Sequence, residues 1–349
     1  MRTQEKQGSK KIVALIIGLL VILLALIGWG YYENINNNFN QNSDNSGNTA
    51  LADKKLKVGK PISILLMGTD TGALGRNYTG RTDSMIVATI NPNSKQTTFT
   101  SIPRDTKVKI DGDMKPYQKI NAAYEIGGSE QAKNTVSELL NIPIDYYATV
   151  NMHGIKQMVD AVGGVDITPK MTFDYEGISV KKGKTQHMDG FTALQYSRMR
   201  YQDPLGDYGR QIRQRQVLEA ILLKAAKISS VSHYQSILTS LHGNLRTDLS
   251  FNDMILLGSK YREALHNFRE TALQGQSTTV DGLSYQVISD NELLKNTNEI
   301  RSSLDLPEVS HLSREQKKVN SNKEIHEGDS ENDIFENGES VDNNAEIEG

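Results

Sequence analysis

The sequence predicts an α/β fold in which a mixed central sheet is flanked by helices on both faces, in three α-β-α layers, and is preceded by one transmembrane helix. Three observations predict this arrangement. The chain is 349 residues long, enough for one large domain. A run from Ile12 to Tyr32 carries no charged side chain. Between residues 56 and 308, short apolar runs alternate with segments of helical periodicity.

The uncharged run has the length of a membrane span, because about 20 residues at 1.5 Å rise cross the roughly 30 Å hydrocarbon core. Residues 1–11 hold four basic side chains and one acidic one, and the positive-inside rule keeps this tail in the cytoplasm. Trp29, Tyr31 and Tyr32 suit the outer interface. The alternative is a cleaved signal peptide, which has a shorter apolar core and a small-residue cleavage site. We therefore expect an anchor at 12–32 in the cell membrane, with the remainder outside, in a Gram-positive bacterium.

Composition divides the rest of the chain into three parts. Residues 33–55 are rich in asparagine and poor in large apolar groups, which predicts a flexible stalk. Residues 56–308 hold 29 basic and 27 acidic residues, and this near-neutral stretch is the predicted extracellular domain. Residues 309–349 are predicted to be an acidic, disordered tail, since 324–349 carries ten acidic residues and no Lys or Arg.

The predicted strands come from short apolar runs. Pro61–Gly68 ends in glycine and is typical of a buried strand. Ser84–Ile90 and Gln96–Ile102 flank an Asn-Pro-Asn-Ser turn, so they predict a β-hairpin. Later strands are predicted at Ile144–Val150, Val165–Thr168 and Leu283–Ile288.

The predicted helices come from apolar residues at helical spacing. His153–Val162 ends at a Gly-Gly pair, a typical helix stop. Arg210–Ile228 is a long helix in which Ile212, Ile221, Ala225 and Ile228 share one face. The other predicted helices are Ser129–Leu140, Asp189–Arg200, His233–Leu241, Asn252–Phe268 and Asn291–Leu304.

Composition also excludes several kinds of chemistry. A net charge of −3 argues against a nucleic-acid partner. The chain has no cysteine, which excludes disulfides, thiolate zinc sites and a cysteine nucleophile. No phosphate-binding P-loop, metalloprotease helix or serine-hydrolase elbow is present. Any chemistry must therefore use carboxylates, guanidinium groups and other oxygen or nitrogen side chains.

Three loops place charges beside buried strands. They are Gly68-Thr69-Asp70, Arg81-Thr82-Asp83 and Ile102-Pro103-Arg104-Asp105. Each charge alone is typical of a surface turn. However, Asp83 opens one strand of the predicted hairpin and Arg104 follows its antiparallel partner, so both should lie at one end of the sheet. Asp70 shares that end if its strand pairs nearby.

A fourth charged patch lies between residues 197 and 216. It holds the arginines of Ser-Arg-Met-Arg, two loop aspartates and a helix start rich in Arg and Gln. Arg210, Arg213 and Gln214 are expected to share one helix face by their spacing. Positive side chains at a helix N-terminus oppose its dipole, so an anionic partner is needed to offset them, and guanidinium groups grip phosphate bidentately. The alternative is a solvated helix start or a site for anionic lipid headgroups.

The spacing of Arg198 and Arg200 makes a further prediction. On a regular helix, residues two apart point about 200° from each other, whereas in a strand they share a face. To grip one phosphate group together, the chain at Met199 must be non-helical. We expect it to leave helical geometry by about Ser197.

These motifs together resemble the LytR-CpsA-Psr family of membrane-anchored cell-wall proteins. The matching stretches occur in order over about half of the chain: Ile64–Asp70, Arg81–Asn91, Ser101–Thr106, Lys119–Gly128, Ile142–Asn151, Val159–Val165, Ala193–Arg200 and Asp207–Gln216. The resemblance implies a phosphotransferase that moves a glycopolymer from a polyprenyl-pyrophosphate carrier to the muramic acid 6-hydroxyl of peptidoglycan. It also implies a mixed sheet between helices with an apolar tunnel for the membrane lipid's tail.

Motif positions imply a role for each charged residue. By this resemblance Asp70 and Asp83 hold Mg²⁺ (or Mn²⁺), and Asp207 lies near the head group as a base or metal-side partner. The residues that bind the pyrophosphate are implied to be Arg81, Arg104, Arg198 and Arg200, assisted by Gln214. Arg210 and Arg213 are weaker assignments to the same ligand. A non-catalytic binding module with a regulatory role, and a pyrophosphatase acting on the same lipid, remain the alternatives.

Overall fold

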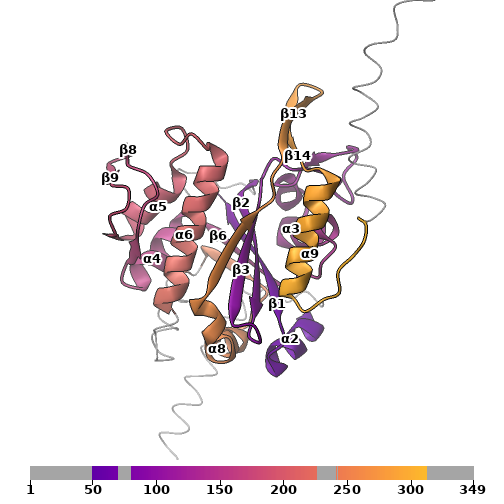
Figure 1. The fold of residues 1–349 in the computed structure, drawn as a ribbon, viewed down its shortest axis with the longest axis horizontal. Coiled ribbons are helices and arrows are strands. Elements are labelled where there is room, and N and C mark those ends of the chain that lie inside the picture. Colours follow the sequence, from indigo (N-terminus) through magenta and orange to yellow (C-terminus); the bar gives the residue numbers. More distant parts are fainter. Residues whose placement is uncertain (1–48, 70–79, 226–240, 242, 313–349) are drawn as a thin grey trace, which may run out of the picture.

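A computed structural model describes residues 49–69, 80–225, 241 and 243–312, and its centre is a six-stranded mixed sheet (Figure 1). The strand order is β11-β6-β1-β2-β3-β12. The pairs β1–β6 and β3–β12 are parallel, and the other neighbours are antiparallel. The strands are β1 (Ile62–Thr69), β2 (Thr82–Asn91), β3 (Gln96–Ile102), β6 (Tyr146–Asn151), β11 (Leu245–Thr247) and β12 (Phe268–Ala272).

Helices cover both faces of the sheet, as predicted. Leu65 of β1 and its partner Val87 of β2 face one core, and Ile64 with its partner Ala88 faces the other. The alternation explains why β1 carries apolar side chains on both of its faces. The first core is closed by α3 (Ala122–Leu140) and α9 (Asp290–Ser303); the second by α2 (Thr49–Val58), α6 (Asp207–Ala225), α8 (Phe251–Lys260) and the 3-10 helix η1 (Arg262–His266).

Smaller elements surround this frame. A third core lies between α6, α4 (Met152–Ala161), α5 (Gly190–Arg198) and the strand pairs β7 (Val165–Ile167) with β10 (Gln186–Met188) and β8 (Phe173–Tyr175) with β9 (Ile178–Val180). Two short hairpins, β4 (Lys107–Val108) with β5 (Gln118–Lys119) and β13 (Gln276–Val280) with β14 (Leu283–Val287), lie near the upper end of the sheet in Figure 1.

The structure corrects three sequence predictions. The helix predicted over Asn252–Phe268 ends at Lys260, and Phe268 instead begins β12, where its ring stacks on Phe99 at 5.5 Å. Residues 49–55 of the predicted stalk belong to α2, because Ala52 and Leu56 are buried in the second core. The folded region also runs to residue 312, where a buried leucine packs on the first core.

Some predictions fall outside the described residues. These are the anchor at 12–32, the tail at 1–11, residues 33–48 of the stalk, nearly all of the helix at 233–241 and the acidic tail from 313 onward. Within the ranges that the structure describes, no helix is both long and apolar enough to cross a membrane.

A buried ion pair joins α3 to the segment after β11. Lys133 Nζ lies 3.2 Å from Asp248 Oδ2, and the backbone N–H of Tyr147 donates to Asp248 Oδ1 at 2.7 Å. Burial raises the pKa of the Asp248 carboxyl to about 6, although Tyr147 and Lys133 favour its charged form. This carboxyl therefore binds a proton more readily in the folded chain than in the unfolded one.

We expect this group to make the folded chain more stable as the pH falls. Between about pH 7 and pH 5, the folded carboxyl takes up a proton while the unfolded one does not, which adds about 1 kcal/mol to the free energy of unfolding. Asp248→Asn, which keeps an acceptor for Tyr147, removes this contribution. The measurement is thermal unfolding of both proteins at several pH values; a difference between them that stays constant with pH would contradict the prediction.

Candidate active site

Charged residues gather at the end of the sheet where β2 begins and β3 ends. The Arg104 guanidinium donates from Nη1 to the Asp83 carboxylate, as the antiparallel hairpin predicts. Arg104 Nε lies 3.7 Å from Asp105 Oδ2, whose other oxygen pairs with Lys119 at 2.8 Å. Burial opposes the charge on Arg104, but the charges of Asp83, Asp105 and Asp207 outweigh it together and raise its pKa. The surrounding carboxylates therefore stabilise the charged form of the Arg104 guanidinium.

The first turn of α6 brings further groups to the same place. Arg210 is only 7% exposed, and its Nη2 donates to the backbone oxygen of Asp83 at 2.9 Å and pairs with Asp207 Oδ1 at 2.8 Å. Gln211 donates to Asp207 Oδ2 at 3.0 Å, and Arg200 Nε lies 3.9 Å from Asp207 Oδ1. Burial lowers the pKa of Arg210, against the attraction of Asp207. Sequence elements far apart thus form one cluster.

Arg213 does not join this cluster. Its guanidinium donates to the Asp203 carboxylate and to the backbone oxygen of Met199, and it lies 5.7 Å from the ring of Phe173. The expectation that it shares a ligand-facing surface with Arg210 is therefore not met. Three residues turn a helix by about 300°, so Arg213 points about 60° away from Arg210, toward the loop before α6 instead of the sheet.

The remaining predicted residues contact groups outside this cluster or lie outside the described part of the chain. Arg81 is exposed and pairs with Glu125 of α3 at 2.7 Å. Arg198 ends α5, with Nη1 at 3.4 Å from Gln195 Oε1. Met199 has φ −55° and ψ 134°, so the chain does leave helical geometry between the two arginines, two residues later than Ser197. Asp70 lies outside the described residues.

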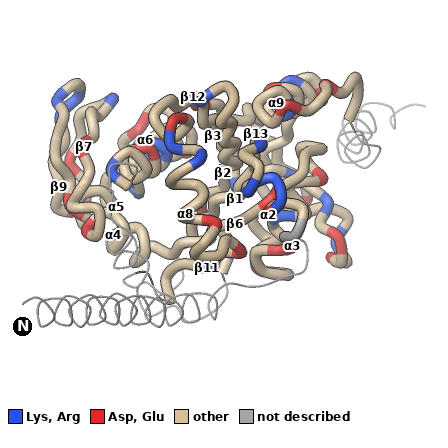
Figure 2. Tube along the Cα trace, turned by 90° about the horizontal axis from the view of Figure 1, so that it is seen from below, with Lys and Arg blue, Asp and Glu red and all other residues tan. Residues whose placement is uncertain are grey.

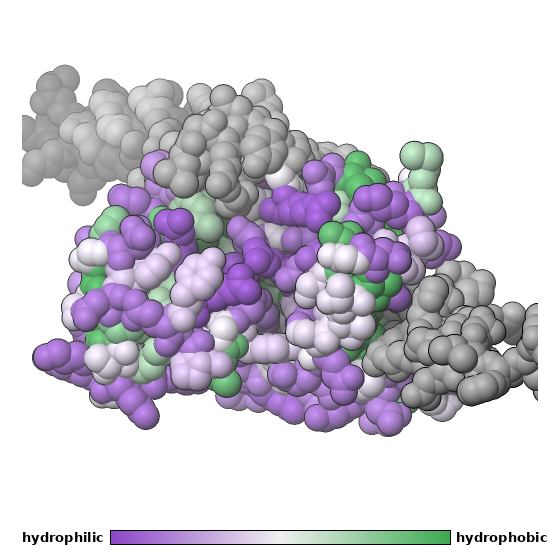
Figure 3. Space-filling view, turned by 90° about the horizontal axis from the view of Figure 1, so that it is seen from above, coloured by the Kyte–Doolittle hydropathy of each residue, from purple (hydrophilic) through white to green (hydrophobic). Residues whose placement is uncertain are grey.

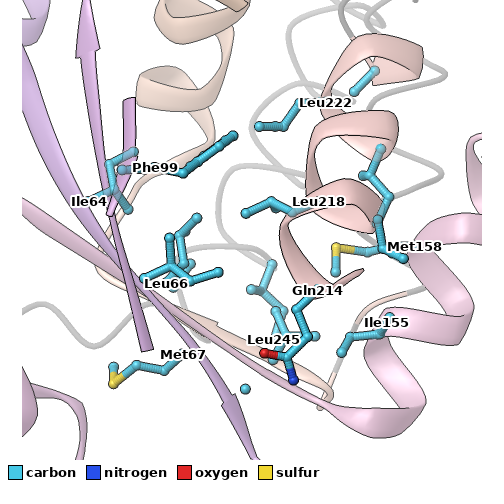
Figure 4. A pocket seen from close by; sticks show the side chains of 18 of the residues that line it. Ile64, Leu66, Met67, Phe99, Ile155, Met158, Gln214, Leu218, Leu222 and Leu245 are labelled. Carbon is cyan, nitrogen blue, oxygen red and sulfur yellow. The ribbon is translucent and has the colours of Figure 1, made fainter. Parts of the chain in front are cut away.

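An apolar cavity of about 370 Å³ opens beside the cluster, between the sheet and α4, α6 and α8 (Figure 4). Gln214 stands at one end and Leu222 at the other. Three polar residues of its wall, Ser84, Ser197 and Gln214, neighbour the charged cluster in sequence. The fourth, Thr97, lies elsewhere and donates its hydroxyl to the backbone oxygen of Ala264 at 2.9 Å. Gln214 Oε1 is buried and has no hydrogen-bond partner among the described residues. The cavity thus combines a long apolar wall with one polar end.

Sequence reasoning missed much of this wall. Of the face predicted for α6, Ile221 and Ala225 line the cavity, but Ile212 does not. The lining residues of α6 follow helical spacing and could have been found from it: Gln214, Val217, Leu218, Ile221, Leu222 and Ala225. Arg215 was also missed; it joins α6 to the sheet through Glu270 at 3.1 Å and the Ser101 hydroxyl.

Hydrophilic side chains dominate the middle of the face that carries the charged cluster, around a hollow in which apolar atoms are visible (Figure 3). Arg104 and Arg200 remain partly exposed there, with 24% and 41% of their side-chain surface accessible. A ligand that reaches this face meets guanidinium groups before it meets the apolar wall.

Comparison with known proteins agrees with the motifs. The model of the LytR_cpsA_psr family matches residues 30–302. The chain belongs to the LytR-CpsA-Psr family. Over 299 residues it is 43% identical to a protein of Enterococcus faecalis named polyisoprenyl-teichoic acid–peptidoglycan teichoic acid transferase TagU, covering 85% of this chain and 98% of that relative.

Solved structures of the family have the same fold. A crystal structure from Enterococcus faecalis described as a transcriptional regulator has a TM-score of 0.68 at 39% identity, covering 77% of this chain and 96% of that one. A structure described as TagT bound to LIIa-WTA has a TM-score of 0.60 at 29% identity, covering 71% and 92%.

The partners of Arg213 predict a structural role. Arg213→Ala leaves the buried Asp203 carboxylate without its cation, so the free energy of unfolding should fall by about 3 kcal/mol. Thermal unfolding of the detergent-solubilised protein measures this loss. Lys182→Ala, in an exposed loop, is the control and should change stability by less than about 0.5 kcal/mol. A stable Arg213→Ala protein with weakened ligand binding would contradict this prediction and indicate that Arg213 contacts the ligand.

Proposed function

We propose that this protein transfers a glycopolymer from a polyprenyl-pyrophosphate carrier to the muramic acid 6-hydroxyl of peptidoglycan. The observation that carries the proposal is the junction of the arginine cluster with the apolar cavity. Arg104 and Arg200 stand beside Asp83 and Asp207, and Gln214 lies where the polar end meets the apolar wall. Such a site suits a ligand with an anionic head and a long apolar chain.

The reaction breaks one bond of the pyrophosphate. The acceptor hydroxyl attacks the phosphorus that bears the glycopolymer, a phosphodiester forms, and polyprenyl phosphate leaves with the electrons of the broken P–O bond. Phosphoryl transfer depends on positioning and charge neutralisation more than on covalent help from the protein. Arg81, Arg104, Arg198 and Arg200 are assigned to the phosphate oxygens, where fixed cations stabilise the charge that develops on the leaving group. Asp207 is assigned to receive the proton of the acceptor hydroxyl.

We assign Mg²⁺ (or Mn²⁺) to Asp70 and Asp83. Oxygen donors suit Mg²⁺, which usually takes one or two carboxylates and completes its shell with water and phosphate oxygens. Within the described ranges, no group of three or more His, Cys, Asp or Glu side chains forms a ready metal site, and Asp70 lies outside those ranges. When bound, the ion neutralises phosphate charge. The Asp83 carboxylate accepts a hydrogen bond from Arg104 Nη1, and this contact orients the carboxylate.

The proposed location follows from the same substrate. We place the N-terminal tail in the cytoplasm, the anchor at 12–32 in the membrane and the catalytic domain outside, where carrier lipid and peptidoglycan meet. The E. faecalis relative named a teichoic acid transferase and the TagT structure described with LIIa-WTA support a cell-wall polymer as the cargo.

The deciding experiment is transfer in vitro. Purified full-length protein, a synthetic polyprenyl-pyrophosphate-linked glycan and peptidoglycan oligomers are incubated with and without Mg²⁺, and product is detected by mass. Appearance of a phosphodiester-linked product supports the proposal. Release of the glycan phosphate without attachment would identify a pyrophosphatase, and binding without turnover would favour the regulatory role suggested by the name of the transcriptional-regulator relative.

The two metal-site carboxylates should be needed for turnover but not for all binding. Asp70→Ala and Asp83→Ala should each lower the transfer rate by at least about a thousandfold, because charge on the phosphates is no longer neutralised. Binding of the carrier lipid should survive in part, since the cavity is unchanged. Rates at wild-type level for both variants in Mg²⁺ would show that the metal assignment is wrong.

Arginine geometry should matter beyond charge. Arg198→Lys or Arg200→Lys keeps the charge but loses the bidentate fork, so the transfer rate should fall at least about tenfold. Lys181→Arg and Lys182→Arg, at exposed positions away from the cluster, are matched controls and should leave it unchanged. The measurement is transfer rate and donor affinity at two salt concentrations. Full activity of both active-site lysine variants would favour a binding module that responds only to net charge.

A further inference from the structure

Helix α2 presents an exposed face that no other described element covers. Leu51 and Val58 are 68% and 61% exposed, and Lys54 stands between them at helical spacing. Lys57 and Lys60 are exposed beside this stripe. Single exposed apolar residues are common on soluble proteins. On α2, two of them lie on one face with lysines between and beside them, and a face that combines lysines with apolar side chains suits a membrane surface.

The charged residues of α2 divide between its inner and outer faces. Asp53, the one acidic residue of the helix, accepts a hydrogen bond from the Tyr146 hydroxyl at 3.0 Å. Lys55 turns inward too and pairs with Asp145 at 2.7 Å. The outward residues of α2 therefore carry positive charge without a compensating carboxylate on the same helix. Figure 2 shows basic residues along α2 in the view from below.

The neighbours of α2 connect this face to the apolar cavity. Helix α2 contacts α8, and α8 and η1 supply Leu257 and Leu265 to the cavity wall. In Figure 1, α2 and α8 lie at the end of the sheet opposite to the β13–β14 hairpin. A surface that meets α2 thus lies near the apolar part of the cavity, away from the charged cluster.

We propose that α2 docks onto an anionic lipid bilayer, with Leu51 and Val58 in the acyl boundary and Lys54 and Lys57 against lipid phosphates. The inference rests on the proposed membrane anchor. Residues 33–48 separate that anchor from α2 and span at most about 55 Å when fully extended, so α2 stays within reach of the bilayer surface. An anionic surface attracts each nearby lysine, and apolar side chains gain from leaving water. Docking holds the domain in one orientation, with the apolar part of the cavity toward the source of its lipid.

The absence of cysteine from the chain permits a clean test. Full-length Leu51→Cys and Val58→Cys proteins, labelled with an environment-sensitive fluorophore, are reconstituted into phosphatidylcholine vesicles with or without phosphatidylglycerol. The expected result is a blue shift and quenching by nitroxide lipids only where phosphatidylglycerol is present. A label at Lys182→Cys, on an exposed loop far along the chain, should show neither effect.

Charge variants make the test quantitative. In the Leu51→Cys background, Lys54→Gln and Lys57→Gln should each lower the ratio of docked to undocked protein about fivefold. The control pair Lys181→Gln and Lys182→Gln should leave it unchanged. A label that stays in water in every vesicle overturns the proposal. So does a label shielded from water but not quenched by nitroxide lipids, because a second copy or the chain's own acidic tail then covers α2. Failure of the protein to remain with vesicles in flotation overturns the anchor itself and is a separate result.

Discussion

Arg210 joins the first turn of α6 to the first residues of β2, and the geometry of the site depends on this contact. Its guanidinium is almost fully buried between the backbone of Asp83 and the carboxylate of Asp207. A cation at a helix N-terminus opposes the helix dipole, and the two aspartates offset that cost. Because the helix start is held at the sheet end, one turn further along Gln214 reaches the polar end of the cavity, and the residues beyond it line the apolar wall.

The arginines around the site divide by burial. Three arginines of α6 are buried, and each pairs with a different carboxylate: Arg210 with Asp207, Arg213 with Asp203 and Arg215 with Glu270. Burying such pairs costs desolvation, so they orient the helix more than they stabilise the fold. Arg104 and Arg200 retain exposed surface, as does Arg81, so a ligand can reach these guanidinium groups. The arginines around the site thus serve two purposes.

The cavity beside these charges has a physical cost and a use. A void of about 370 Å³ leaves lining side chains without dispersion partners on one side. The opposite face of the sheet, by contrast, is covered by α3 and α9 over a continuous apolar cluster. An apolar chain that fills the cavity restores the missing contacts and excludes water, which strengthens the interactions of a phosphate head group with the arginines next to it.

Much of the frame follows from local patterns in the sequence. The β2–β3 hairpin and the meeting of Asp83 with Arg104 could be predicted, because antiparallel neighbours joined by a short turn must bring those two positions together. The departure from helical geometry at Met199 was predicted from the requirement that Arg198 and Arg200 face one ligand, because residues two apart point away from each other on a helix. The residues of Phe268–Ala272 form a strand only because β3, far back in the chain, offers hydrogen-bond partners, and no local pattern reveals that pairing. Likewise, α6 is surrounded on several sides, so spacing could not tell that Arg210 faces the sheet and Arg213 the preceding loop. The sequence by itself determined which chemical groups the site has and at which end of the sheet they begin; only the tertiary structure decided which of them are exposed to a ligand, because burial and ion pairing depend on the elements packed around each side chain.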